Sequence, residues 1–193
     1  MTGNARVVLA LTGASGAAIG IRIAERLATR NDVSTQLIVS DAARRTLTHE
    51  VGPDAWDRLA GHVEVVHQAD DIGATLASGS FRTAGMIVAP CSMRTLAAIA
   101  TGLSDNLIAR AADVHLKERR RLVLLTRETP LHLGHLRNMV AVTEMGAVVM
   151  PPVPAFYHLP QSVADLVDHL AARAIDMIDL PGEAEASAWN GDA

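Results

Sequence analysis

The sequence predicts an open α/β fold with a mainly parallel sheet, and three observations support this prediction. First, short apolar runs typical of buried strands recur along the 193 residues, at 7–11, 34–39, 86–89, 122–125 and 147–150. Second, segments with apolar residues at helical spacing separate these runs, and alternation of strands with helices is typical of parallel sheets. Third, a glycine-rich turn follows the first run and opens a helix, Thr12-Gly13-Ala14-Ser15-Gly16-Ala17. In such folds ligands bind at the carboxyl ends of the strands.

Composition sets limits on the class of protein. Hydrophobic residues make up 49% of the chain and charged residues 20%, which allows a sizeable core. We expect one domain over residues 1–180 and a tail over 181–193. The net charge of -4 argues against a nucleic-acid binder, and one cysteine excludes an internal disulfide framework. Neither a signal-peptide pattern nor an apolar run of ~20 residues is present, so we expect a cytoplasmic protein without a membrane partner.

The glycine-rich turn is the first candidate binding element. Its glycines let backbone N–H groups approach a phosphate, the following helix adds the positive end of its dipole, and Ser15 offers a hydroxyl. An ordinary tight turn between strand and helix explains the same residues equally well. The second strand ends in Ser40, and the helix after it reaches Glu50. That carboxylate is a candidate pocket group, although a charged helix residue is more often solvated. Between residues 51 and 85 the pattern predicts a short helix, a short strand and a loop, at 54–60, 63–66 and 69–80.

The stretch after the central strand carries hydroxyls and a cation on the first turn of a helix. Ser92 can cap this helix, or it can bind an anion together with Thr95. Arg94 opposes the helix dipole, which favours the anion site over a simple cap. For Cys91 a buried structural thiol is favoured over a nucleophile, because the sequence places no activating base beside it.

Cations also surround the next strand. Residues 104–106 can cap a helix on which Arg110 and Lys117 lie close to two turns apart, so both can project from one face. After the strand, Arg127 and Glu128 either pair with each other or flank a ligand.

The last third of the chain adds aromatic and histidine side chains. His132 and His135 open a helix over residues 132–142, and hydrogen-bonded roles are favoured over a metal site because no third ligand type is near. A proline-rich loop after the last strand carries Tyr157. A capping box at Ser162 begins a helix that extends to residue 178. Arg173 on this helix is a surface or a pocket residue, and Trp189 lies in the tail.

Several motifs taken together resemble the UbiX/Pad1 flavin prenyltransferases, long labelled aromatic acid decarboxylases or their small subunit. They are Thr12-Gly-Ala-Ser-Gly-Ala17, Ala89-Pro-Cys-Ser-Met-Arg-Thr95, Arg110-Ala-Ala-Asp-Val114, Leu116-Lys-Glu-Arg-Arg120, Arg127-Glu-Thr-Pro130 and Pro154-Ala-Phe-Tyr157. The resemblance extends from about Val7 to Ile178, with the motifs in the family's order.

The resemblance implies a three-layer flavodoxin-like or Rossmann-like sandwich that assembles into a homododecamer and binds FMN between subunits. It also implies the activity: transfer of a dimethylallyl group from dimethylallyl monophosphate to N5 and C6 of reduced FMN, without a metal. The product, prenylated FMN, would serve a UbiD-type decarboxylase.

Carried over by motif, the resemblance assigns three sets of residues. Flavin contacts fall on Gly13, Ala14, Ser15, Gly16, Ser40, Ser92, Met93, Arg94, Thr95 and Arg127. The prenyl-phosphate end falls on Arg110, Lys117, Arg127, Tyr157, Arg173 and Trp189. Acid, base and relay positions fall on Ser15, Glu50 and Glu128.

The sequence departs from the family at residues 131–139, where Arg137 reverses a charge and Gly134 loosens the turn. Two alternatives remain open. A flavin-dependent decarboxylase of cysteine-type substrates would carry a Pro-x-Met-Asn motif, which the sequence lacks. A flavin carrier without catalysis would not need the phosphate-binding residues.

Overall fold

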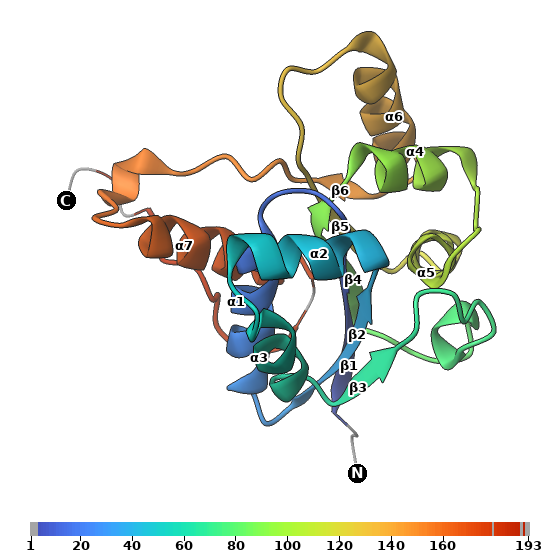
Figure 1. The fold of residues 1–193 in the computed structure, drawn as a ribbon, viewed down its shortest axis with the longest axis horizontal. Helices are drawn as coiled ribbons and strands as arrows, with labels where there is room; N and C mark the ends of the chain where they lie inside the picture. The colour runs from blue at the N-terminus through green and yellow to red at the C-terminus, as the bar shows by residue number, and fades with distance from the viewer. Residues whose placement is uncertain (1–3, 179, 190, 192–193) are drawn as a thin grey trace.

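A six-stranded, wholly parallel sheet forms the centre of the computed structural model (Figure 1), which describes residues 4–178, 180–189 and 191. The strands are β1 Ala5–Leu11, β2 Val33–Val39, β3 Val65–His67, β4 Gly85–Cys91, β5 Arg121–Thr126 and β6 Val148–Val149. Their order across the sheet is β3-β2-β1-β4-β5-β6. This is the strand order of the Rossmann fold. The predicted α/β class and the Rossmann-like arrangement are therefore confirmed.

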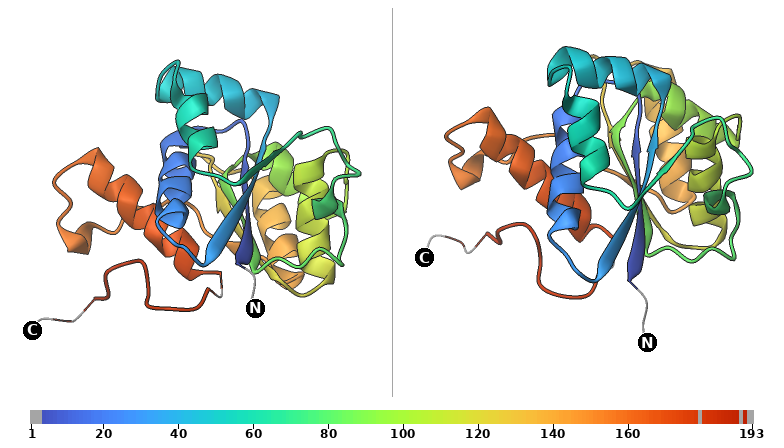
Figure 2. Two further views of the ribbon diagram at one scale, coloured as in Figure 1. Left: turned by 90° about the horizontal axis from the view of Figure 1, so that it is seen from below. Right: turned by 60° about the horizontal axis from the view of Figure 1, so that its bottom comes forward.

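Helices cover both faces of the sheet and make three layers, as Figure 2 shows. One face carries α1 Ala17–Ala28, α2 Asp41–Glu50, α3 Ala55–Gly61 and α7 Val163–Asp176, and the other carries α4 Met93–Thr101, α5 Leu107–Lys117 and α6 Leu133–Glu144. Two short 3-10 turns, η1 Thr75–Ala77 and η2 Phe156–His158, lie in the connections. Alternate residues of a strand point to opposite faces, so Leu9 packs in one core and Ala10 in the other. No helix in the described part of the chain is long and apolar enough to cross a membrane.

The strand order fixes where a ligand can bind. β1 lies between β2 and β4, so the strands that precede β4 in the chain extend the sheet on one side of β1 and the later strands extend it on the other. The carboxyl ends of β1 and β4 therefore form the switch point of the sheet, and a crevice opens there in folds of this type. The glycine turn follows β1 and Ser92 follows β4, so the structure brings the two predicted anion-binding elements together.

Local signals located most elements well, with several boundary errors. The helix expected to extend to residue 178 ends at Asp176, and the strand expected at 147–150 is Val148–Val149. The strand expected at 63–66 is Val65–His67, because Val63 and Glu64 still belong to the turn after α3, where the Val63 N–H donates to Ala60 O. The helix expected at 132–142 begins at Leu133 and runs to Glu144, with His132 as its N-cap. The capping box at Ser162 is confirmed: its Oγ accepts from the Asp165 N–H, and the Asp165 carboxylate accepts from the Ser162 N–H.

Candidate active site at the carboxyl edge of the sheet

Thr12 joins the two strands at the switch point. Its hydroxyl donates to Pro90 O at 2.8 Å and accepts from the Ser92 N–H at 2.7 Å. The side chain is buried, so these bonds hold the glycine turn against the start of α4 without competition from water. The sequence reasoning did not single out Thr12 by itself. The signal was available, because it is the hydroxyl residue that opens the glycine motif.

The last residues of the glycine turn contact the carboxylate of Glu50. Gly16, at φ +111°, is the N-cap of α1, and the N–H groups of Gly16 and Ala17 both donate to Glu50 Oε2 at 2.9 Å. Burial of this carboxyl opposes its ionisation, but hydrogen bonds from Ser15, Gly16 and Ala17 outweigh that effect. Together with the charge of Arg127, they hold the pKa of Glu50 below its ordinary value. Glu50 is exposed in the single chain, as its position predicts, but its carboxylate is also fixed by backbone N–H groups at the start of α1.

A cavity of about 370 Å³ lies at the other end of the same turn. Its lining is Thr12, Gly13, Ser40, Ala42, Ala69, Ser92, Arg94, Thr95, Asn106 and Ile108. Ser40 and Ser92 cap the helices that follow their strands: each Oγ accepts a backbone N–H three residues on, from Ala43 at 3.2 Å and from Thr95 at 3.3 Å. An alanine at position 13 would collide with Ala42, so glycine is what lets this turn lie against α2.

The lining suits a flavin mononucleotide. Apolar side chains, those of Ala42, Ala69 and Ile108, provide contact for a flat ring system, while hydroxyls and a guanidinium surround them. A cavity of this size with few polar groups among apolar ones is typical of small-ligand sites. The buried hydroxyl of Thr126 ends β5 at the same edge, and the described structure gives it no hydrogen-bond partner. The residues present therefore fit a phosphate-bearing flavin.

Arg94 lines this cavity, but the helix-dipole argument that favoured a ligand beside it is wrong. Its guanidinium pairs with Asp105 at 2.7 Å, and the side chain is 67% exposed. The neighbouring carboxylate offsets the unfavourable helix dipole, so the dipole argument alone gave no reason to require a ligand. Ser92 acts as the N-cap that the simpler interpretation expected.

Arg127 and Glu128 follow β5 at the same edge as the glycine turn. The Arg127 N–H donates to Cys91 O at 3.0 Å, and its charge acts on Glu50. Glu128 accepts from the N–H of Thr129 at 3.1 Å. Among the described contacts, no hydrogen bond or ion pair joins the side chains of Arg127 and Glu128, so the predicted pairing is not formed. Their role in flanking a ligand stays a prediction.

Arg110 and Lys117 share one face of α5, as predicted. The Arg110 guanidinium donates to Ala77 O at 3.1 Å and pairs with Asp113 at 2.6 Å. Lys117 pairs with Glu118, and its Nζ lies so close to Gly79 that an added Cβ there would be 2.7 Å away. Lys117 precedes β5 and Arg127 follows it, so a strand length of about 20 Å separates the two within one chain.

Tyr157, Arg173 and Trp189 form a separate group at α7. The rings of Tyr157 and Trp189 meet edge to face with centroids 5.2 Å apart, and Arg173 pairs with Asp176 at 3.3 Å. Within the described residues, none of the three makes a hydrogen bond, ion pair or ring contact with a residue that lines the cavity. Of the ten residues predicted to contact the flavin, five line this cavity: Gly13, Ser40, Ser92, Arg94 and Thr95. The assignment of the flavin and prenyl-phosphate residues stays a prediction.

Two further predictions concern thiol and imidazole groups. Cys91 is buried, and burial raises the pKa of its thiol to about 12, which confirms a structural role. His132 Nδ1 accepts from the N–H groups of Gly134 and His135 at 3.0 and 3.4 Å, and the two imidazole rings stack at 3.5 Å. These contacts confirm the hydrogen-bonded role for His132, whereas the buried Nδ1 of His135 has no hydrogen-bond partner among the described residues. The described residues contain no group of three metal-ligating side chains.

Fold and site together define a flavin-binding α/β protein, and comparison with known proteins agrees. The model of the flavoprotein family matches residues 1–174, so the chain belongs to that family. The chain is 53% identical over 175 residues to the flavin prenyltransferase UbiX of Thauera aromatica, covering 91% of this chain and 89% of the relative. Within the flavoproteins the chain is therefore a member of the UbiX flavin prenyltransferases.

Two solved structures are similar over nearly the whole chain. A UbiX protein (PadA1) in complex with FMN and dimethylallyl pyrophosphate superposes with a TM-score of 0.89 at 48% identity, covering 97% of this chain and 98% of that chain. A dodecameric FMN-dependent UbiX-like decarboxylase from Escherichia coli O157:H7 gives a TM-score of 0.91 at 44% identity, covering 96% and 100%.

Proposed function

We propose that this chain transfers a dimethylallyl group from dimethylallyl monophosphate to N5 and C6 of reduced FMN, and that the prenylated FMN serves a UbiD-type decarboxylase. The observation that carries the proposal is the glycine turn, which has a flavin-sized cavity at Gly13 and the bound carboxylate of Glu50 at Gly16. The relative solved with FMN and dimethylallyl pyrophosphate supports it.

The flavin-binding residues hold the acceptor in place. In our proposal Gly13 presents its backbone N–H group, while Ser40, Ser92 and Thr95 offer hydroxyls. Gly16, whose N–H donates to Glu50, shapes the turn beside them. The remaining members of this set are Ala14, Ser15, Met93, Arg94 and Arg127. Reduced flavin supplies the electron-rich N5 and C6. Fixing it against the prenyl group lowers the entropic part of the barrier and excludes water.

Glu50 is the acid/base group of the proposal. Two backbone N–H groups and the Ser15 hydroxyl fix its carboxylate, and the lowered pKa keeps it ionised near neutral pH. An ionised, oriented carboxylate can accept the proton that leaves C6, and Ser15 can relay it. Glu128, which follows β5 at the same edge, is proposed as the second acid/base group.

Cations stabilise the leaving phosphate. Breaking an allylic carbon–oxygen bond leaves a positively charged prenyl fragment and a doubly charged phosphate. Fixed guanidinium and ammonium groups stabilise that developing charge without a metal. We assign this role to Arg110, Lys117, Arg127 and Arg173, with the Tyr157 hydroxyl as a further donor and Trp189 as a closing wall.

These cations come from more than one copy of the chain. β5, about 20 Å long, lies between Lys117 and Arg127 within one chain, and we therefore assign one of the two cations to a neighbouring copy. The dodecameric relative supports such an assembly, and we propose a homododecamer here, in which closed symmetry repeats the same composite site.

The test is product analysis. The purified protein is incubated without oxygen with reduced FMN and dimethylallyl monophosphate, and the released flavin is weighed by mass spectrometry. We expect a flavin heavier by one prenyl unit. A parallel reaction with the pyrophosphate defines the preferred donor. Unmodified FMN alone in both reactions would overturn the proposed function.

A further inference from the structure

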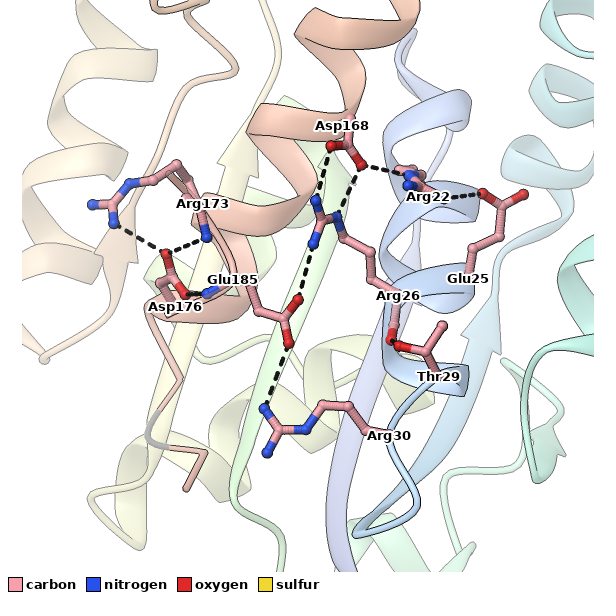
Figure 3. A network of polar contacts seen from close by, with 10 residues as sticks. Arg22, Glu25, Arg26, Thr29, Arg30, Asp168, Arg173, Asp176 and Glu185 are labelled. Carbon is pink, nitrogen blue, oxygen red and sulfur yellow. Dashed lines mark hydrogen bonds and ion pairs between the residues drawn. The ribbon is translucent and has the colours of Figure 1, made fainter. Parts of the chain in front are cut away.

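A network of ion pairs holds the C-terminal segment, residues 180–189, against the domain (Figure 3). Arg26 on α1 donates from Nε and Nη2 to both carboxylate oxygens of Asp168 on α7, at 2.9 and 2.8 Å, and from Nη1 to Glu185 at 2.9 Å. Arg30 reaches the other Glu185 oxygen at 3.6 Å. Glu185 therefore ties the segment to α1, which is tied in turn to α7.

Asp176 makes the second attachment. Its Oδ1 accepts from the Glu185 N–H at 2.6 Å, and its Oδ2 accepts from the Ala186 N–H at 3.2 Å. The same Oδ2 accepts from the Arg173 guanidinium at 3.3 Å. Figure 3 shows Arg173 and the segment on the two sides of this carboxylate. The Asp176 side chain is only 9% exposed, so one shielded carboxylate fixes both the segment and Arg173.

The attachments are stronger than ordinary surface pairs. Arg26 and Glu185 are each 20% exposed, which limits screening by solvent and salt. Hydrogen bonds from Arg26 and then from Arg22 lower the pKa of Asp168 to about 2, although burial opposes this effect. Asp168 is therefore ionised at neutral pH.

The segment leads directly to Trp189. Trp189 follows Ala186, the last residue bound to Asp176, by three positions. Its indole lies edge to face against the Tyr157 ring, at an interplanar angle of 76°. Both rings are more than half exposed in the single chain, Tyr157 at 55% and Trp189 at 59%. One aromatic contact between exposed rings contributes only about 1 kcal/mol, so this arrangement depends on the attachments at 185 and 186.

We propose that Glu185 and Asp176 are positioning residues for the prenyl-phosphate end of the site. Glu185 holds Trp189 against Tyr157, and Asp176 holds the same segment while it orients Arg173. The inference deepens the proposed function and depends on it for the identity of the ligand. The ion-pair network itself is independent of that function.

The first experiment measures the attachment without substrate or flavin. The chain has two tryptophans, so in a Trp56→Phe background the fluorescence anisotropy reports Trp189 alone. We expect Glu185→Gln and Asp176→Asn each to lower the anisotropy. The matched control is Glu183→Gln, an exposed glutamate on the same segment, which should change nothing. Unchanged anisotropy in both test variants would overturn the attachment.

The second experiment asks whether the attachment acts through Trp189. We expect Glu185→Gln to raise KM for dimethylallyl monophosphate about three- to tenfold, with FMN affinity unchanged and kcat changed little, because lost positioning weakens binding rather than chemistry. In a Trp189→Phe background the same substitution should add little further. An equal KM change in both backgrounds, or a weakened FMN affinity, would overturn the positioning role. Wild-type protein that makes no prenylated flavin would instead overturn the proposed function, and the anisotropy result would still stand.

Discussion

Replacement of Glu50 by glutamine tests the carboxylate that ends the glycine turn. The carboxylate accepts two backbone N–H groups at 2.9 Å at the start of α1. Glutamine keeps an oxygen acceptor but loses the charge. The loss removes the favourable helix dipole and the extra strength of charge-assisted hydrogen bonds. Because the residue is exposed in the single chain, we expect a discounted cost of about 1 kcal/mol, or about 3 °C in Tm.

The pH dependence of this cost has a defined sign. The folded-state pKa of Glu50 is lowered from 4.5, so the stabilisation is present above that pH and is lost as pH falls through the folded-state value. Wild type and Glu50→Gln should therefore converge in stability as pH falls below the folded-state pKa of Glu50, which lies below 4.5. Urea denaturation at a series of pH values measures the difference.

The same variant should lose turnover far beyond its loss of stability. Removing an acid/base group costs about 10²- to 10⁴-fold in rate, whereas a site that merely loosens would lose much less. Single-turnover product formation with FMN bound measures the effect, and Glu64→Gln, an exposed glutamate, is the matched control. If Glu50→Gln turns over as fast as wild type, Glu50 takes no part in the chemistry.

Two further predictions concern the backbone and a buried histidine. Gly16→Ala should lower the free energy of unfolding by about 1 kcal/mol, because φ at Gly16 is +111° although the added Cβ has room. Gly61→Ala, in α3, is the control. A Tm of Gly16→Ala equal to that of wild type would refute this reasoning. His115 is buried, with Nδ1 at Ala111 O and Nε2 at Thr83, and burial lowers its pKa from 6.5 to about 4. Its folded state binds fewer protons, so stability should fall by up to about 3 kcal/mol as pH drops from 6.5 to 4. That slope should become shallower in His115→Gln and persist in His62→Gln, and an unchanged slope in His115→Gln would contradict the assignment.

Much of the fold is predictable because its signals are local. Apolar spacing, the glycine turn and the caps at Ser92, Asn106 and Ser162 depend on neighbours within a few residues, and the structure retains all of them. The strand order is not local. It decides that the turns after β1 and β4 meet, and only the general rule for parallel sheets anticipated that meeting.

The site was harder to predict because its decisive contacts span long separations. Glu50 binds amides 33 and 34 residues away, and no pattern within α2 indicates this. Arg94 finds its partner at Asp105, across the connection to α5. The motifs grouped Lys117 with Arg127 by function, but an entire strand lies between them and directs them to opposite edges of the sheet.

We propose that the active site is shared between copies of the chain, and mixing of variant subunits tests this arrangement. Lys117→Ala and Glu50→Gln should each be nearly inactive alone. The two variants are co-expressed with different tags, and oligomers that contain both are isolated. If Lys117 and Glu50 reach one site from different copies, about a quarter of the sites in a random assembly are intact, and about a quarter of wild-type turnover returns. Mixed oligomers no more active than the single variants would place both residues in one chain and contradict the account.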